Sequence, residues 1–275
     1  MDISKIDSIA IGGFDGMHIG HQELFSHLGD NGAIVAIETG YANLTPRKDR
    51  ERYSKYPIFY YELSQIKHLD GKEFVDALKN RFVSLKKIVV GYDFHFGKDR
   101  KYSFDDLRSF FDGEVIVVDE VCLRGDSVHS HKIRAKISLG DIAGANRFLG
   151  HNYTISGSVI AGQGLGKKQF VPTINIITSG YLLPIEGVYA AFVRLDDSEH
   201  LDMAVVFLGH RVSTDGSFAI EAHIIDRDIK KCERLSISFV DFIRANRKFD
   251  SFNELKSAIL FDIDSTKDRL KHLSL

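Results

Sequence analysis

The rhythm of apolar segments changes near Gly150, and this change constrains the fold more than any other feature of the chain. From Ser8 to about Val121, short apolar runs alternate with segments of helical periodicity, which is typical of β-α units on a parallel sheet. After Gly150, strand-like segments follow one another without helices between them, which predicts an antiparallel sheet or small barrel. We therefore predict an α/β chain of two domains, residues 1–150 and 151–275.

The same patterns predict the individual elements. The strands expected in the first part are Ser8–Gly12, Ala33–Glu38, Lys87–Gly91 and Glu114–Val121. The helices expected there are His18–Leu28, Lys72–Phe82, a capped helix at Ser103–Phe111, and two short helices in Lys132–Leu149, the second opened by Asp141. The strands expected in the second part are Thr154–Ile160, Thr173–Ile177, Val188–Leu195, Met203–Leu208, Phe218–Asp226 and Leu235–Ile243. A capping box of Ser251 and Glu254 predicts a terminal helix that continues to about Leu273.

Composition and charge exclude several classes of protein. Hydrophobic residues make up 44% of the 275 residues and charged residues 27%, the balance of an ordinary globular protein. The net charge of −2 is divided evenly between the two parts, which argues against a nucleic-acid partner. The longest apolar stretches, such as Met203–Leu208, are much shorter than the roughly 20 residues of a membrane-spanning helix, so no membrane partner is expected.

The expected setting is a reducing cytoplasm. The segment Met1–Lys5 lacks the apolar core of a secretory signal, and Cys122 and Cys232 show no paired spacing for a disulfide, zinc or redox site. The 12 histidines include no HExxH pattern and no Cys/His cluster, so we expect most of them on the surface.

A segment rich in glycine and histidine follows the first expected strand. Residues 12–21 read Gly-Gly-Phe-Asp-Gly-Met-His-Ile-Gly-His. The glycines allow a sharp turn close to a ligand, and the free N–H groups at the start of the next helix favour a phosphate. His18 and His21 are neighbours on the first helical turn, so both imidazoles can reach one anionic group and stabilise charge that develops on phosphoryl oxygens.

This segment resembles the HxGH nucleotidyltransferase family, and more narrowly the adenylyltransferase module of bacterial bifunctional riboflavin kinase/FAD synthetases. The family's GxFDGxHxGH run is matched by Gly12, Phe14, Asp15, Gly16, His18, Gly20 and His21. The resemblance implies a Rossmann-like domain in which His18 and His21 hold the phosphates of ATP. It also implies that Gly12, Phe14, Asp15 and Gly20 belong to the ATP and flavin site.

A second family element, which ends in Phe-x-Phe-Gly, is similar to Gly91–Gly97. The resemblance implies that Asp93 and Phe94 lie near the flavin or the nucleotide. The other interpretation of Phe94 and Phe96 is core packing after a strand, and we expect it to hold for at least one of them.

A third family element, Ser-Ser-Thr-x-Ile-Arg, is matched at Ser130, Ile133 and Arg134, whereas His129 and His131 replace hydroxyl residues. Arginine pairs bidentately with phosphate, and a hydroxyl or imidazole donates to the same oxygens, so the replacements are chemically tolerable. By the resemblance, Ser130 and Arg134 join His18 and His21 in catalysis.

A second candidate phosphate site follows the domain boundary. Its glycine loop contains Gly162, Gly164 and Gly166, followed by Lys167 and Lys168, and backbone amides and lysines of this kind can surround a polyphosphate. Pro172 precedes Thr173 and Asn175, which are two residues apart on an expected strand and therefore share one side. Their oxygens suit magnesium.

This second region resembles the riboflavin kinase module, whose pattern is a glycine loop leading to Gly-Phe-Pro-Thr-Ala-Asn. Pro172, Thr173 and Asn175 match; the chain departs from the family at Lys167, at Gln169–Val171, at Phe207 and at Val212–Ser213. The resemblance implies an antiparallel barrel with a terminal helix, magnesium and ATP organised by Thr173 and Asn175, and Glu221 as general base. The residues alone allow Glu221 to be either a strand-end surface carboxylate or a partly desolvated base.

The resemblance covers about residues 8–270 and implies two reactions: phosphorylation of riboflavin to FMN, then adenylylation of FMN to FAD with release of pyrophosphate. It implies Mg²⁺ as cofactor and ATP, riboflavin and FMN as small-molecule partners. Three alternatives stay open: one activity only, a nucleotidyltransferase with a different acceptor, and a non-catalytic flavin-binding regulator. The sequence does not give the oligomeric state.

Overall fold

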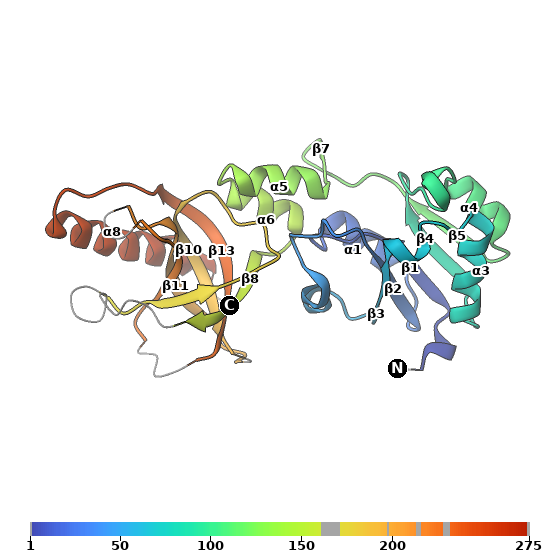
Figure 1. Ribbon diagram of the computed structural model, residues 1–275, viewed down its shortest axis with the longest axis horizontal. Helices are drawn as coiled ribbons and strands as arrows, with labels where there is room; N and C mark the ends of the chain where they lie inside the picture. The colour runs from blue at the N-terminus through green and yellow to red at the C-terminus, as the bar shows by residue number, and fades with distance from the viewer. Residues whose placement is uncertain (1, 161–170, 197, 213–215, 228–231, 274–275) are drawn as a thin grey trace. The chain divides into compact units, whose positions relative to one another are not determined.

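The computed structural model of the protein describes residues 2–160, 171–196, 198–212, 216–227 and 232–273 (Figure 1). The chain forms two compact units, Met1–Ser130 and His131–Leu275. Each unit has its own sheet and its own apolar core, as the change of rhythm in the sequence predicts.

A five-stranded parallel sheet forms the first unit, in the order β3-β2-β1-β4-β5. Its strands are β1 (Ser8–Gly12), β2 (Gly32–Glu38), β3 (Ile58–Glu62), β4 (Lys87–Gly91) and β5 (Glu114–Val118). Because β2 and β3 lie on one side of β1 and β4 and β5 on the other, the strand order reverses between β1 and β4. Ligands of open α/β sheets bind at the carboxyl ends of the strands at such a reversal.

The side chains of β1 alternate between two apolar cores, one on each face of the sheet. Ile9 and Ile11 pack with Phe74 and Val75 of α3, whereas Ala10 packs with Phe14 and Phe25 on the other face. The helices of the unit are α1 (Ile19–Ser26), α2 (Leu63–Ile66), α3 (Gly71–Arg81) and α4 (Phe104–Phe110), and a short ribbon is formed by β6 (Cys122–Leu123) and β7 (Asp126–Ser127).

The second unit is a closed barrel in the order β10-β11-β12-β9-β8-β13, with every neighbouring pair antiparallel. Its strands are β8 (Tyr153–Ile160), β9 (Ile174–Ile177), β10 (Gly187–Leu195), β11 (Asp202–His210), β12 (Phe218–Ile224) and β13 (Arg234–Ala245). The predicted barrel is confirmed. In the described residues of this part of the chain, the α-helices are α5 (Ser130–Ser138), α6 (Ile142–Leu149) and α8 (Phe252–Leu270).

Helix α8 packs its apolar side chains on the barrel, with Ile263 against Val188 and Val205, and Leu270 against Phe192. The hydroxyl of Ser251 caps the helix by accepting from the N–H of Glu254 at 3.2 Å, as predicted. The other half of the predicted box differs, because the Glu254 carboxylate accepts from the N–H of Asp250 instead of Ser251.

The compact units divide after Ser130, about twenty residues before the predicted boundary near 151. Helix α6 explains the difference, because Asn146 binds the barrel on two sides. Its amide nitrogen donates to the carbonyl of Phe239 at 2.9 Å, and its side-chain oxygen accepts from the N–H of Tyr153 at 2.8 Å. A boundary between functional modules at 150/151 stays a prediction.

Candidate active sites

The loop between β1 and α1 has an unusual backbone conformation. Phe14 and Met17 have φ angles of 50° and 45°, and Gly16 has 92°. Non-glycine residues in the left-handed region cost energy and persist where their surroundings hold them. Asp15 holds this loop: its buried carboxylate accepts from the backbone N–H groups of Asn43, Leu44 and Thr45 at 3.2, 2.9 and 3.0 Å.

His18 and His21 lie together at the start of α1. His18 is the N-cap residue; its Nδ1 accepts from the N–H of His21 at 3.3 Å, so its ring proton is on Nε2 in the neutral form. The two rings stack with centroids 3.5 Å apart. Burial first, and then the positive charges of His18, Arg50 and His129, hold the pKa of His21 well below its usual value.

Two glycines keep this pair in place. A Cβ atom at Gly20 would lie 3.2 Å from His18 Nδ1, and one at Gly12 would lie 3.0 Å from the ring of Phe14. The ring of Phe14 is buried and meets the ring of His21 edge-on at 5.2 Å. Side chains at positions 12 and 20 would therefore displace the groups that position the histidines.

Arg50, which belongs to none of the sequence motifs, holds the backbone of this loop. Its side chain is fully buried, it forms an ion pair with buried Glu38, and its Nε donates to the carbonyl of Phe14 at 3.2 Å. Its Nη2 is buried and has no hydrogen-bond partner. The guanidinium lies 5.8 Å from the ring centre of Tyr60, and burial raises the pKa of Tyr60 to about 12.

Polar groups gather after β4 and β5, at the carboxyl ends of the strands. Glu120 Oε1 lies 2.9 Å from His129 Nε2 and accepts from the hydroxyl of Tyr92 at 2.9 Å. These hydrogen bonds, first from His129 and then from Tyr92, hold the pKa of Glu120 below its usual value. The next residue, Ser130, donates to the carbonyl of Asp15 at 2.7 Å, which links this segment to the histidine loop.

The remaining predicted residues of the adenylyltransferase site have different surroundings. Asp93 is exposed, with its carbonyl 3.0 Å from the Nδ1 of His95. Phe94 and Phe96 are both buried in the core and their rings stack at 5.5 Å, so core packing holds for both. Arg134 lies on α5 in the second compact unit. Ligand contacts of Phe14, Asp15, Asp93, Phe94 and Arg134 stay predictions.

In the barrel, Asn175 of β9 and Glu221 of β12 are direct cross-strand neighbours, so their side chains share one face. Arg211 joins them. Its Nε donates to Glu221 Oε1 at 2.6 Å, and its Nη2 lies 2.6 Å from the same oxygen and 2.7 Å from Asn175 Oδ1. The carboxylate and amide oxygens are donors of the kind that Mg²⁺ takes, and the guanidinium of Arg211 lies between them.

Other predicted residues of the barrel site lie beside these two or outside the described residues. Thr173 is exposed immediately before β9, and the carbonyl of Pro172 accepts from His223 Nδ1 at 2.9 Å. The glycine loop with Gly162, Gly164, Gly166 and Lys167 lies outside the described residues. Within the described ranges, no group of three His, Cys, Asp or Glu side chains could hold a metal ion.

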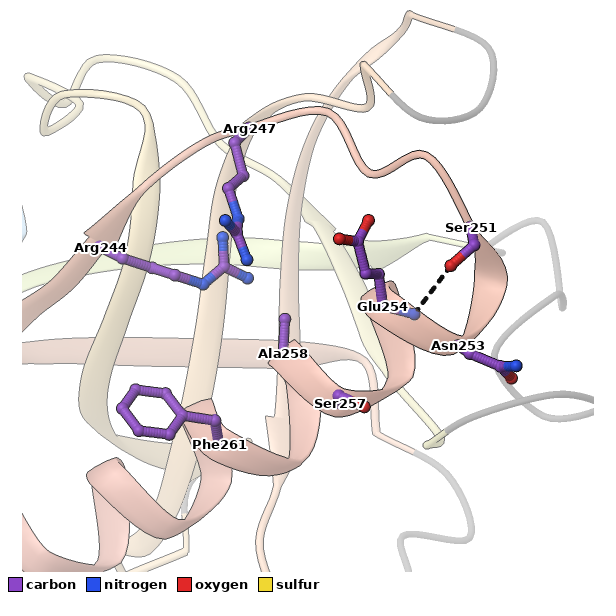
Figure 2. A pocket seen from close by; sticks show the side chains of 8 residues that line it. All are labelled: Arg244, Arg247, Ser251, Asn253, Glu254, Ser257, Ala258 and Phe261. Carbon is purple, nitrogen blue, oxygen red and sulfur yellow. Dashed lines mark hydrogen bonds between the residues drawn. The ribbon is translucent and has the colours of Figure 1, made fainter.

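A pocket of about 570 Å³ lies between the β13–α8 connection and the first turns of α8 (Figure 2). It is lined by Arg244, Arg247, Ser251, Asn253, Glu254, Ser257, Ala258 and Phe261. Asp262 holds the Arg244 guanidinium through contacts of 2.7 to 3.2 Å, and burial raises the pKa of this aspartate. With guanidinium groups and the exposed ring of Phe261 around it, the pocket suits a planar, polar molecule.

Hydrogen bonds connect this pocket to Arg211. Asn246, the residue before Arg247, donates to the carbonyl of His210 at 2.7 Å and to Glu186 at 3.3 Å. His210 immediately precedes Arg211 and contacts Glu186 at 2.7 Å through its Nδ1. The chain segment between Arg244 and Arg247 is therefore hydrogen-bonded to the residue that precedes Arg211.

A parallel α/β unit with a histidine pair at the reversal of its strand order, followed by a closed antiparallel barrel, defines the class: a two-domain protein with a candidate site in each unit. The family model "FAD synthetase" matches residues 57–132 and the family model "Riboflavin kinase" matches residues 149–270. The chain belongs to the bifunctional riboflavin kinase/FMN adenylyltransferase family.

Individual relatives cover nearly the whole chain. The bifunctional riboflavin kinase/FMN adenylyltransferase of Listeria monocytogenes is 31% identical over 97% of this chain and 92% of its own length. That of Pseudomonas fluorescens is 28% identical over 94% and 91%. A crystal structure described as a macrolide-efflux protein from Streptococcus pneumoniae has a TM-score of 0.80 and 28% identity, and covers 95% of this chain and 94% of that one. In the described part of this chain, no helix is long and apolar enough to span a membrane.

Proposed function

We propose that this protein phosphorylates riboflavin to FMN in its barrel unit and transfers the adenylyl group of ATP to FMN in its α/β unit, which forms FAD and releases pyrophosphate. One observation carries the proposal: a single chain holds the paired imidazoles of His18 and His21 and, in its barrel, Glu221 opposite Asn175. Membership of the family supports both reactions.

In the kinase reaction, Glu221 takes the proton of the ribityl hydroxyl as that oxygen attacks the γ-phosphate of ATP. Its position on a strand, held by Arg211, fixes the direction in which its carboxylate points. Asn175 and Thr173 would hold Mg²⁺, which would neutralise charge on the ATP phosphates. The pocket of Arg244, Arg247 and Phe261 takes the flavin ring.

In the second reaction, a phosphate oxygen of FMN attacks the α-phosphorus of ATP and the bond to pyrophosphate breaks. The nucleophile is already an anion, so the site has to orient it and stabilise the developing charge. Nε2–H of His18, His21, the hydroxyl of Ser130 and the guanidinium of Arg134 are the donors for this work. The proposed setting is the cytoplasm, with ATP, riboflavin and FMN as the partners.

A test with purified protein separates the two reactions. The protein is incubated with riboflavin, ATP and Mg²⁺, and the flavins are separated by chromatography; a parallel sample receives FMN in place of riboflavin. We expect FMN and FAD from the first sample and FAD from the second. Riboflavin that stays unchanged would overturn the kinase assignment, and FMN that stays unchanged in the second sample would overturn the adenylyltransferase assignment.

A further inference from the structure

Arg211 is the first residue after β11, and the hairpin that leads to β12 fixes its backbone. Its N–H donates to the carbonyl of Ser217 at 2.9 Å, and its own carbonyl accepts from the N–H of Gly216 at 3.2 Å. Its side chain extends back to Glu221, and its Nη1 donates to the hydroxyl of Ser217 at 2.9 Å. The guanidinium is thus anchored by the hairpin that carries the general base.

Arg211 contacts both Glu221 and Asn175, which have different roles in the proposed kinase reaction. Nη2 lies 2.6 Å from the carboxylate of Glu221, the general base, and 2.7 Å from the amide oxygen of Asn175, the metal ligand. One positive charge therefore occupies the place between the base and the metal ligand. The hydrogen bond from Arg211 takes one of the two lone pairs of Asn175 Oδ1, and the positive charge of the guanidinium repels a divalent cation at that oxygen.

The burial of these groups suits an exchange of partners. The side chains of Arg211 and Glu221 are 18% and 21% exposed, so the pair is near the surface of the barrel and is not sealed in its core. When a metal ion displaces a partly exposed guanidinium from one acceptor, the guanidinium can keep its hydrogen bond to a carboxylate, and the change costs little free energy. The five N–H donors of an arginine allow such a change without moving the whole side chain.

We propose that Arg211 is a positioning residue of the kinase centre, which holds Asn175 and Glu221 around its positive charge and gives up the oxygen of Asn175 when the magnesium ion of Mg·ATP enters. The proposal rests on the proposed kinase function. It has two consequences that are separable: Arg211 orients Glu221 for proton transfer, and Arg211 competes with the divalent cation for Asn175.

The test compares metal binding and kinase activity in the full-length protein with Arg211→Met, Arg211→Lys and a matched control, Arg227→Met. Arg227 pairs instead with Asp202 of β11 in the same barrel. Binding of Mn²⁺ in the presence of ADP is measured by the loss of the free-ion resonance signal. Sites of the α/β unit contribute equally to all four proteins, so the differences between them report on the barrel.

For Arg211→Met we expect about tenfold tighter Mn²⁺ binding, because a like charge next to the cation is gone, together with at least a tenfold lower kcat for FMN formation. Arg211→Lys keeps the charge without the planar fork, so its Mn²⁺ affinity should be close to wild type while its kcat stays low. The control should match wild type in both. FAD formation from FMN should be unchanged in every variant, which shows that the proteins are intact.

Unchanged or weaker Mn²⁺ binding in a folded Arg211→Met protein would overturn the competition. If that variant does not fold, the wild type supplies the answer through the Nε–H resonance of Arg211, identified by its absence in Arg211→Lys. This resonance should move when Mg·ADP is added, and a resonance that does not move would overturn the proposal. A wild-type protein that forms no FMN would instead overturn the proposed function, which is a different result.

Discussion

Each unit contains an arginine–glutamate pair beside its candidate site, and the two pairs differ in burial. Arg50 and Glu38 in the α/β unit are 0% and 7% exposed, whereas Arg211 and Glu221 in the barrel are 18% and 21% exposed. A buried charge that loses its partner is costly, whereas a partly exposed one can take a water or a ligand instead. The first pair is therefore a fixed support, and the second can exchange partners during a reaction.

The atoms that each arginine contacts agree with this difference. Arg50 donates to the carbonyl of Phe14, in the left-handed part of the loop that precedes His18, so it stabilises the backbone of the site. Arg211 contacts the side chains of Asn175 and Glu221. In the α/β unit, a buried arginine holds the backbone that positions the reactive groups. In the barrel, contacts between side chains position them.

The largest effect that the comparison predicts is on proton transfer in the barrel. Glu221→Gln keeps the shape of the side chain and removes its basicity, so FMN formation should fall by about 10²- to 10⁴-fold. FAD formation from supplied FMN should stay at the wild-type rate. The measurement is the initial rate of each reaction in the same preparation, and equal loss of both in a folded protein would contradict the division of work between the units.

The buried pair should show its importance in stability. Arg50→Met leaves the carboxylate of Glu38 buried without its partner and should lower the free energy of unfolding of the α/β unit by about 3–5 kcal/mol. The matched control is Arg47→Met, which removes the exposed pair with Glu62 and should cost about 0–1 kcal/mol. Urea unfolding of both variants gives the values, and equal costs would show that burial does not distinguish these pairs.

Removal of one imidazole tests the α/β unit directly. His21→Ala should lower the rate of FAD formation from FMN by about 10²- to 10³-fold, as expected when one preplaced donor to developing charge is lost. FMN formation from riboflavin should be unchanged. His27→Ala is the control on the same part of the chain, because His27 is the C-cap residue of α1 and lies six residues after His21, the last residue of the motif.

Much of the fold could be predicted from sequence because its signals are local. The capping box of Ser103 and Asp106 is present at the start of α4, and Asp141 caps α6. Strand β3 was not predicted: its sequence Ile-Phe-Tyr-Tyr-Glu lies at the edge of the sheet with every residue half-buried, so it shows neither alternation nor a continuous buried run.

The candidate sites follow the same rule. His18 and His21 are three residues apart, and a pattern of that length can be read directly. Arg50 and Arg211 were missed because each contacts a partner 36 residues away, Phe14 for the first and Asn175 for the second. Only the folded chain brings such pairs together, and neither arginine has a local sequence pattern that distinguishes it.

The smallest effect is the contribution of the buried imidazole of His21 to the dependence of stability on pH. Burial is the main cause that holds the pKa of His21 well below 6.5 in the folded protein, and the charges of His18, Arg50 and His129 add to it. The unfolded chain therefore binds this proton first as the pH falls. The contribution of His21 is complete above about pH 6.5 and decreases below it, by at most about 1.4 kcal/mol per pH unit, until the folded pKa is reached. Urea midpoints of wild type and His21→Gln at pH 7.5, 6.5 and 5.5 should diverge only at the lowest pH, with the wild type losing more. Parallel curves would mean that the pKa of His21 is the same in the folded and the unfolded chain, and a wild type that loses less stability than the variant would mean that the loop stabilises a charged imidazole.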